Sequence, residues 1–265
     1  TQINILVNTI LATGTVVGAV SWLTYAFRLF QFPIGILGVS IAGSNLVFFS
    51  DAWKAGKKEN AISFLNSSVF LSFLILMPAA IFSFVMSDEL VSIVFQRGEF
   101  VVKDVANTSL ALQYYMLGLP CYGIYKIFVP VFYAIDKPKI PVFISVFSIC
   151  INIIFCILLT PRYGFKVLAL GTSVSMLVNS FLQGVFLNKS LNISGKYFFN
   201  IKMIKVFIAS AIIFVITRKL KLLLFTAEIV FLKKILFIVT IFLLVVLSYA
   251  IILIILGEHQ ILFKF

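Results

Sequence analysis

The feature that most constrains this chain is a succession of long apolar runs separated by short polar segments. About 20 apolar residues suffice for a helix to cross a bilayer, whereas a membrane barrel shows alternating segments of roughly ten residues. Backbone polar groups in lipid must be satisfied within the protein, so we interpret these longer runs as helices. We expect eight of them, at roughly 1–13, 20–49, 61–86, 106–134, 140–160, 165–187, 200–217 and 232–256.

The composition excludes a water-soluble fold. Of 265 residues, 62% are hydrophobic and 11% are charged, whereas soluble domains carry about 25% charged residues. The predicted fold class is therefore an all-α integral membrane protein, a polytopic helical bundle. Because the loops are short, we expect neighbouring helices to be antiparallel. The net charge of +12 comes from Lys and Arg at the borders of the runs. There they anchor the protein to membrane lipids, and no nucleic acid partner is expected.

Basic loop residues predict the orientation, because cytoplasmic loops are enriched in Lys and Arg. If loop 51–60 is placed in the cytoplasm, the numbers of Lys and Arg residues on the two sides of the membrane are nearly equal. If segment 218–234 and Lys264 are left out, the cytoplasmic side carries more of them, which favours this orientation. We therefore expect a multi-pass protein with a cytoplasmic C-terminus. The chain starts inside an apolar run at Thr1, without a signal-peptide pattern. We expect it to be the C-terminal part of a longer protein.

Two positive charges lie within the runs. Arg28, beside Gln31, stands in the middle of the run 20–49. A charge at membrane depth marks a functional site by default, and a packing contact with carbonyls or Gln31 is the alternative. Lys126 is the second, although its stem could reach the membrane border. All nine Asp and Glu residues lie in loops or at helix ends. The predicted cavity therefore suits an anion, with phosphate the natural candidate.

Glycine and proline accompany both cations, and these residues bend helices. Discontinuous helices commonly line transporter sites. The predicted hinge residues are Pro33, Gly35 and Gly38 near Arg28, and Gly118, Pro120 and Gly123 near Lys126.

Catalytic chemistry is not expected. The sequence has no Gly-rich phosphate loop, nucleophile–base pair or paired carboxylates, and its one histidine, His259, follows the last run. We predict that the protein is not an enzyme and has neither a cofactor nor a His- or Cys-based metal site. Most polar residues in the runs are expected to form interhelical hydrogen bonds, each contributing about 0.6–2 kcal/mol. A cation site built from Asn8, Asn152 and Thr172 stays open as an alternative.

Four segments together resemble the lipid II flippase family, MurJ/MviN, within the multidrug/oligosaccharidyl-lipid/polysaccharide exporter superfamily. Residues 2–9 and 25–39 resemble the start of the family's seventh helix and its eighth helix. Residues 93–100 resemble the external loop that follows, and residues 118–142 the tenth helix and its exit. The family fold has two six-helix lobes plus two C-terminal helices, fourteen in all. The resemblance implies that 1–190 form the second lobe, helices seven to twelve, and 191–265 form helices thirteen and fourteen.

The resemblance also implies a function. The family moves lipid II, an undecaprenyl-pyrophosphate-linked disaccharide peptide, across the bacterial cytoplasmic membrane by alternating access, for peptidoglycan synthesis. Arg28 falls on a cavity arginine of the family, so Arg28, Gln31 and Lys126 are the expected substrate-binding residues. The expected partners are lipid II, membrane lipids and a missing N-terminal lobe. The chain departs from the family at Phe27, usually Asp, and at Asn8, often Asp.

Two alternatives to this function remain open. A related exporter of another lipid-linked glycan or of a drug would share the fold. A non-transporting membrane fragment from a split gene would share the sequence pattern without the activity.

Overall fold

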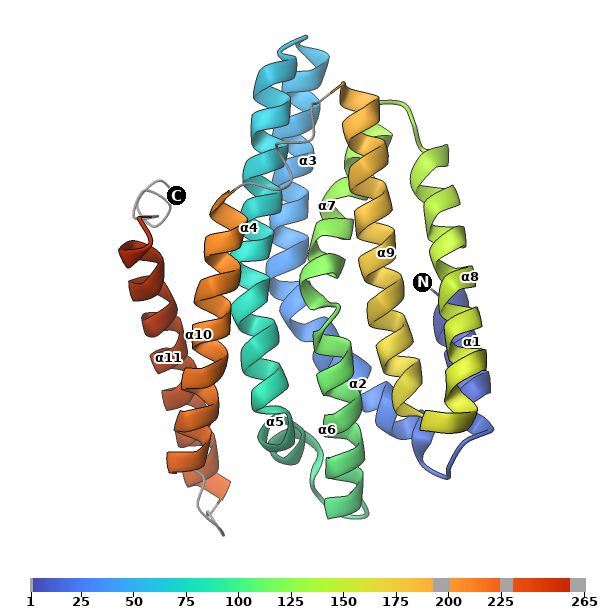
Figure 1. Cartoon of the computed structure of the whole chain (residues 1–265), viewed down its shortest axis with the longest axis vertical. Coiled ribbons are helices and arrows are strands. Elements are labelled where there is room, and N and C mark those ends of the chain that lie inside the picture. The colour runs from blue at the N-terminus through green and yellow to red at the C-terminus, as the bar shows by residue number, and fades with distance from the viewer. Residues whose placement is uncertain (1, 193–200, 225–230, 258–265) are drawn as a thin grey trace.

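The structure, a computed structural model, describes residues 2–192, 201–224 and 231–257, and every regular element within them is helical. Figure 1 shows most of the helices running side by side along the long axis of the molecule, which confirms the predicted all-α bundle. The elements are α1 (Gln2–Thr13), α2 (Ala19–Pro33), the π-helical turn η1 (Ile34–Gly38), α3 (Val39–Lys54), α4 (Lys58–Val85), α5 (Ser87–Phe95), α6 (Val102–Met116), α7 (Leu119–Ala134), α8 (Lys139–Tyr163), α9 (Lys166–Leu191), α10 (Ile201–Leu224) and α11 (Phe231–Ile255).

Each predicted apolar run contains helix, and two runs are bent. Among the described residues, α4, α8, α9 and α11 are each long and apolar enough to cross a membrane. Counting each bent pair as one span raises the number from 4 to 6. The bend is 41° between α2 and α3 and 49° between α6 and α7. By the same criterion of length and composition, the 12-residue α1 is too short, and α10 carries basic residues near both ends.

The two bends coincide with the glycines and prolines singled out in the sequence. Pro33 ends α2 and is followed by the π-helical turn, which contains Gly35 and ends at Gly38. Proline lacks a backbone N–H, so it cannot complete the regular helical ladder at this point. The second bend lies at Gly118, with Pro120 in the first turn of α7.

The short helix α5 lies where the sequence predicted only a loop, residues 87–104. Ser87, Glu89 and Val91 are its buried residues. The Ser109 hydroxyl donates to the Ser87 carbonyl over 3.2 Å, and the Gln113 amide donates to the Ser87 hydroxyl over 2.8 Å. These bonds dock α5 onto α6. Its nine residues are too few to produce an apolar run of spanning length, which is why sequence reasoning missed it.

The connections alternate between the two ends of the bundle. In Figure 1 the α3–α4 and α7–α8 connections lie at one end, and α5 and the α8–α9 turn lie at the other. This arrangement matches the antiparallel order expected from short loops. Residues 193–200, 225–230 and 258–265, with His259 and Lys264 among them, lie outside the described residues.

The helices α10 and α11 stand beside α4, at the edge of the molecule opposite α1 and α8 (Figure 1). An ion pair fixes one end, because the Lys221 ammonium lies 2.9 Å from a carboxylate oxygen of Glu89. The same ammonium donates to the Val85 carbonyl over 3.0 Å. Lys234 donates to the Ser92 hydroxyl over 2.8 Å. Basic residues from both helices therefore anchor this pair to α5 and the end of α4.

Replacing Lys221 by Ala should lower the thermal stability of the purified protein in detergent. Glu89 is only 8% exposed, so the substitution leaves a buried carboxylate without its cation. Because Lys221 itself is partly exposed, the expected loss of unfolding free energy is about 1–2 kcal/mol, less than for a fully buried ion pair. The melting temperature should then fall by about 2–6 °C. Lys219→Ala, an exposed lysine of the same helix, is the matched control, and an equal shift in both variants would contradict the ion-pair explanation.

Candidate functional site

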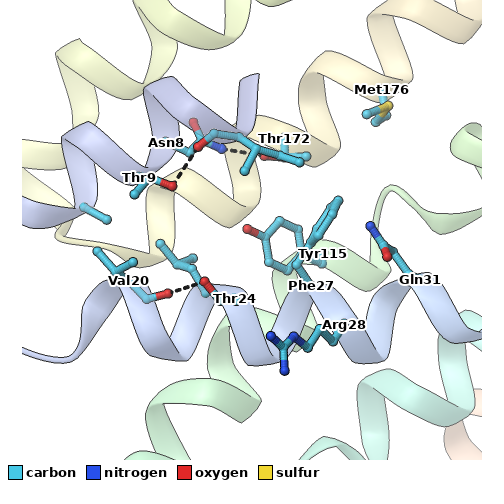
Figure 2. A pocket seen from close by; sticks show the side chains of 13 residues that line it. Asn8, Thr9, Val20, Thr24, Phe27, Arg28, Gln31, Tyr115, Thr172 and Met176 are labelled. Atoms are coloured by element: carbon cyan, nitrogen blue, oxygen red, sulfur yellow. Dashed lines mark hydrogen bonds between the residues drawn. The ribbon is translucent and has the colours of Figure 1, made fainter. Parts of the chain in front are cut away.

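Arg28 lines a pocket of about 240 Å³ between α1, α2, α6 and α9. It is the one charged side chain among the described residues that form the pocket. Figure 2 shows the arrangement, with polar side chains contributed by each of α1, α2, α6 and α9. The other polar lining residues are Asn8, Thr9, Thr24, Gln31, Tyr115 and Thr172. The predicted association of Arg28 with Gln31 in one cavity is therefore present, and no carboxylate balances the guanidinium there.

The apolar face of α2 fixes how Arg28 is presented. Trp22, Ala26 and Phe30 recur at helical spacing and are buried. Phe27 packs its ring against Phe30, at 5.6 Å between centroids, and against Tyr115, at 5.5 Å. Because this face is held in the core, Arg28, the residue after Phe27, lies outside it and is exposed. Phe27 thus occupies with an aromatic ring the position where the resemblance implies a carboxylate.

The guanidinium of Arg28 contacts an aromatic ring. Its central carbon lies 5.6 Å from the ring centroid of Tyr25, within the range of a cation–π interaction. In Figure 2 the side chain points away from the Asn8–Thr172 pair. Within the described residues, the contact that positions Arg28 is with Tyr25 and not with the amide of Gln31. Arg28 remains exposed, which leaves its donors available to a ligand.

Lys126 occupies a different part of the lobe. It is half-buried on α7, and its ammonium lies 5.4 Å from the ring centroid of Tyr122. The described residues that line the Arg28 pocket do not include it. The structure therefore does not bring the two predicted cations into one cavity.

Lys126 should matter less than Arg28 for transport by the full-length protein. Lys126→Ala should cause a partial loss, and Lys126→Arg should be close to the wild type, because a point charge without directional bonds tolerates this exchange. The measurement is growth rescue of cells depleted of their own flippase, at matched expression. Full tolerance of Lys126→Glu would mean that this ammonium has no part in holding an anion.

Asn8, Asn152 and Thr172, the residues of the alternative cation site, do lie together. The Asn8 amide donates to the Thr172 hydroxyl over 2.9 Å, and the Asn152 amide donates to the Asn8 side-chain oxygen over 3.3 Å. The Thr172 hydroxyl donates to the Leu168 carbonyl over 3.0 Å. These bonds join α1, α8 and α9. They occupy the side-chain oxygens of Asn8 and Thr172, which a cation would need as ligands. The cation site stays a prediction, and the geometry seen here is that of an interhelical hydrogen-bond cluster.

Two of the predicted hinge glycines are places of close approach. A Cβ atom on Gly118 would lie 2.9 Å from the Cα of Ser173, and one on Gly123 would overlap a methyl group of Leu76. The Ser173 hydroxyl bonds to the carbonyls of Tyr114 and Tyr115, at 2.6 and 3.2 Å. It thus satisfies backbone groups freed at the α6–α7 break. Ser173 is one of the polar residues that the sequence analysis expected to form interhelical hydrogen bonds, although a serine in an apolar run gives no sign of its partner.

Comparison with known proteins gives a consistent picture. The family model described as lipid II flippase MurJ matches residues 1–247. A probable lipid II flippase MurJ from Rhizobium meliloti (strain 1021) is 33% identical over 182 residues, which are 69% of this chain and 34% of that protein. Its counterpart from Rickettsia prowazekii (strain Madrid E) is 34% identical over 162 residues, 61% of this chain and 32% of that protein.

A solved structure described as lipid II flippase MurJ in an inward closed conformation has a similar fold. Its TM-score is 0.77 at 26% identity, over 96% of this chain and 52% of that chain. The chain thus spans about a third of the length of the curated relatives that it matches. The family model covers most of the chain, and the fold agrees with it. This chain therefore belongs to the lipid II flippase MurJ family.

Proposed function

We propose that this chain supplies the C-terminal half of a lipid II flippase of the bacterial cytoplasmic membrane, with lipid II as its substrate. The observation that carries the proposal is the Arg28 pocket of about 240 Å³, in which the guanidinium is the one charged group among the described lining residues. A pocket lined by a cation and by no carboxylate suits a diphosphate, and the guanidinium offers paired donors to phosphate oxygens. No covalent chemistry is required of the chain.

In this proposal residues 1–190 form the second transport lobe and residues 191–265 form the additional helix pair. One observation supports this division, since the helices α10 and α11 pack on α4 and α5, at the edge far from α1. The solved relative is nearly twice as long as the part matched by this chain, which supports a further lobe outside it. The distribution of basic loop residues favours a cytoplasmic C-terminus.

The size of the pocket indicates which part of the substrate it serves. A volume of about 240 Å³ lies below the usual range of roughly 300–1,000 Å³ for drug-sized ligands. It can accommodate a diphosphate but not a disaccharide with a peptide. The remaining headgroup would lie between this lobe and a preceding one. Rocking of the two lobes about the bends at Pro33 and Gly118 would then expose the site to each side in turn.

The full-length protein that contains this chain should restore growth to cells depleted of their lipid II flippase. It should also bring lipid II to the outer leaflet of reconstituted vesicles, where an added lipid II-cleaving enzyme can reach it. Transport of a different lipid-linked glycan, with no movement of lipid II, would favour the related-exporter alternative. Loss of all transport by a well-folded full-length protein would favour the non-transporting alternative.

A further inference from the structure

Arg28 borders a second pocket as well as the one described above. This second pocket has a volume of about 580 Å³ and lies at the end of the bundle where α5 is found. It is lined by residues of α2 and of the α5–α6 connection, Arg97 among them. Because the Arg28 guanidinium lies over Tyr25 and points away from the Asn8–Thr172 pair (Figure 2), it stands at the boundary between the two pockets. A ligand held by Arg28 could therefore be reached from either pocket.

The wall of the second pocket is built from packed aromatic rings. The Tyr25 ring lies 4.7 Å from the ring of Phe95 and 5.5 Å from that of Phe100, centroid to centroid. Phe95 and Phe100 are themselves 6.0 Å apart. These three rings hold the α5–α6 connection against α2. Aromatic faces of this kind also offer apolar surface on which a sugar ring can lie.

Asp104 fixes the same connection from its other end. One carboxylate oxygen accepts from the Trp22 indole N–H over 2.8 Å, and the other accepts from the Val101 backbone N–H over 3.0 Å. The turn itself runs through Gly98, whose φ of 57° is a left-handed conformation that favours glycine. The backbone that carries Arg97 and Glu99 is therefore anchored at both ends. Asp104 is committed to this structural role.

The remaining charges of the pocket are those of Arg28, Arg97 and Glu99. Arg97 and Glu99 are exposed, and within the described residues no ion pair is formed by either arginine. Two guanidinium groups suit a diphosphate. A carboxylate beside them would be unfavourable for a simple anion, but it can accept hydrogen bonds from sugar hydroxyl and amide groups. The combination matches a diphosphate linked to an amide-bearing sugar better than an inorganic anion.

We propose that this second pocket is a separate station for the diphosphate–sugar headgroup at the α5 end of the protein, with Arg97 receiving the phosphate from Arg28. This inference rests on the proposed function, since it takes lipid II as the ligand. It assigns to Arg97 a role in passage of the headgroup, distinct from the deeper binding by Arg28.

The test uses the full-length protein in vesicles of phosphatidylethanolamine and phosphatidylglycerol, with lipid II as the probe. Arg97→Ala should slow the appearance of lipid II in the outer leaflet about tenfold, and Arg97→Lys should be intermediate. Arg162→Ala, an exposed arginine at the same end of the bundle that does not line this pocket, should transport like the wild type. If Arg97→Ala matches the wild type while Arg28→Ala is inactive, the station does not exist and the proposed function stands. If the wild type itself moves no lipid II, the proposed function fails.

A footprint separates ligand binding from a merely structural role. Ser21 lines the second pocket and is exposed. In a full-length background without native cysteines, Ser21→Cys should react with a water-soluble thiol reagent and be protected by lipid II. Combining it with Arg97→Ala should abolish this protection. Protection that persists without Arg97, or that phosphatidylglycerol gives in the absence of lipid II, would overturn the assignment.

Discussion

Arg28→Ala in the full-length protein is expected to abolish rescue of flippase-depleted cells. A hydrogen bond to a charged group contributes about 1.5–3 kcal/mol, so loss of a bidentate phosphate contact should cost at least about 3 kcal/mol, or about 100-fold in rate or affinity. Arg28→Lys should rescue poorly, because an ammonium lacks the planar pair of donors. The measurement is colony formation at native expression level, with the protein quantified in the membrane fraction.

Two controls decide between a binding role and a packing role for Arg28. Cysteine at position 28, in a background without native cysteines, should react with a small water-soluble thiol reagent. Cysteine in place of Leu244, an exposed residue midway along α11, should face lipid and stay unreactive. Normal growth of Arg28→Ala, or an unreactive position 28 in every state of the full-length protein, would leave the packing interpretation.

Gly118→Ala is expected to destabilise the protein, because its new methyl group would meet backbone as well as a side chain. The new Cβ would lie 2.9 Å from the backbone Cα of Ser173, so α9 must move as a whole to admit it. Overpacking of this kind typically costs about 1–3 kcal/mol. Movement of α9 would also strain the bonds from the Ser173 hydroxyl to the α6 carbonyls. The measurement is thermal melting of the purified protein in detergent, where Gly118→Val should fail to accumulate.

Gly43→Ala is the matched control for Gly118→Ala. Gly43 lies within α3, and an added Cβ would meet nothing within 4 Å. Because alanine is favoured over glycine in a helix by up to about 1 kcal/mol, this variant should be neutral or slightly more stable. Equal destabilisation by both substitutions would mean that loss of glycine flexibility, and not the contact with α9, determines the outcome.

The number and positions of the long helical segments could be predicted, because the length of an apolar run is read from neighbouring residues alone. The bends at Pro33 and Gly118 were also predictable, since glycine and proline act on their own helix. The helix α5 was not, because its buried side is defined by Ser109 and Gln113 of α6. Likewise, the Lys221–Glu89 ion pair joins residues far apart in sequence, and each alone looks like an ordinary loop or border charge.

The candidate site was predictable in part. Arg28 could be identified because a cation at membrane depth is conspicuous. Asn8, Asn152 and Thr172 lie together, as the alternative cation site would require. The separation of Lys126 from Arg28 could not be foreseen, because it depends on how α7 packs against its neighbours. Arg97 lies in segment 93–100, which resembles a loop of the family, but the sequence assigned no role to this arginine. Its relation to Arg28 emerges only when the aromatic rings fold that connection onto α2.

The π-helical turn after Pro33 bends its span without turning the buried side away from the core. Ala26, Phe30 and Ile34 are buried before the turn, and Ala42, Asn45 and Phe49 are buried after it. The last three follow Ile34 by 8, 11 and 15 positions, which are spacings that recur on one face of an α-helix. The two segments therefore present one continuous side to the core. The bend changes the direction of the helix axis and leaves unchanged which side of the span is buried.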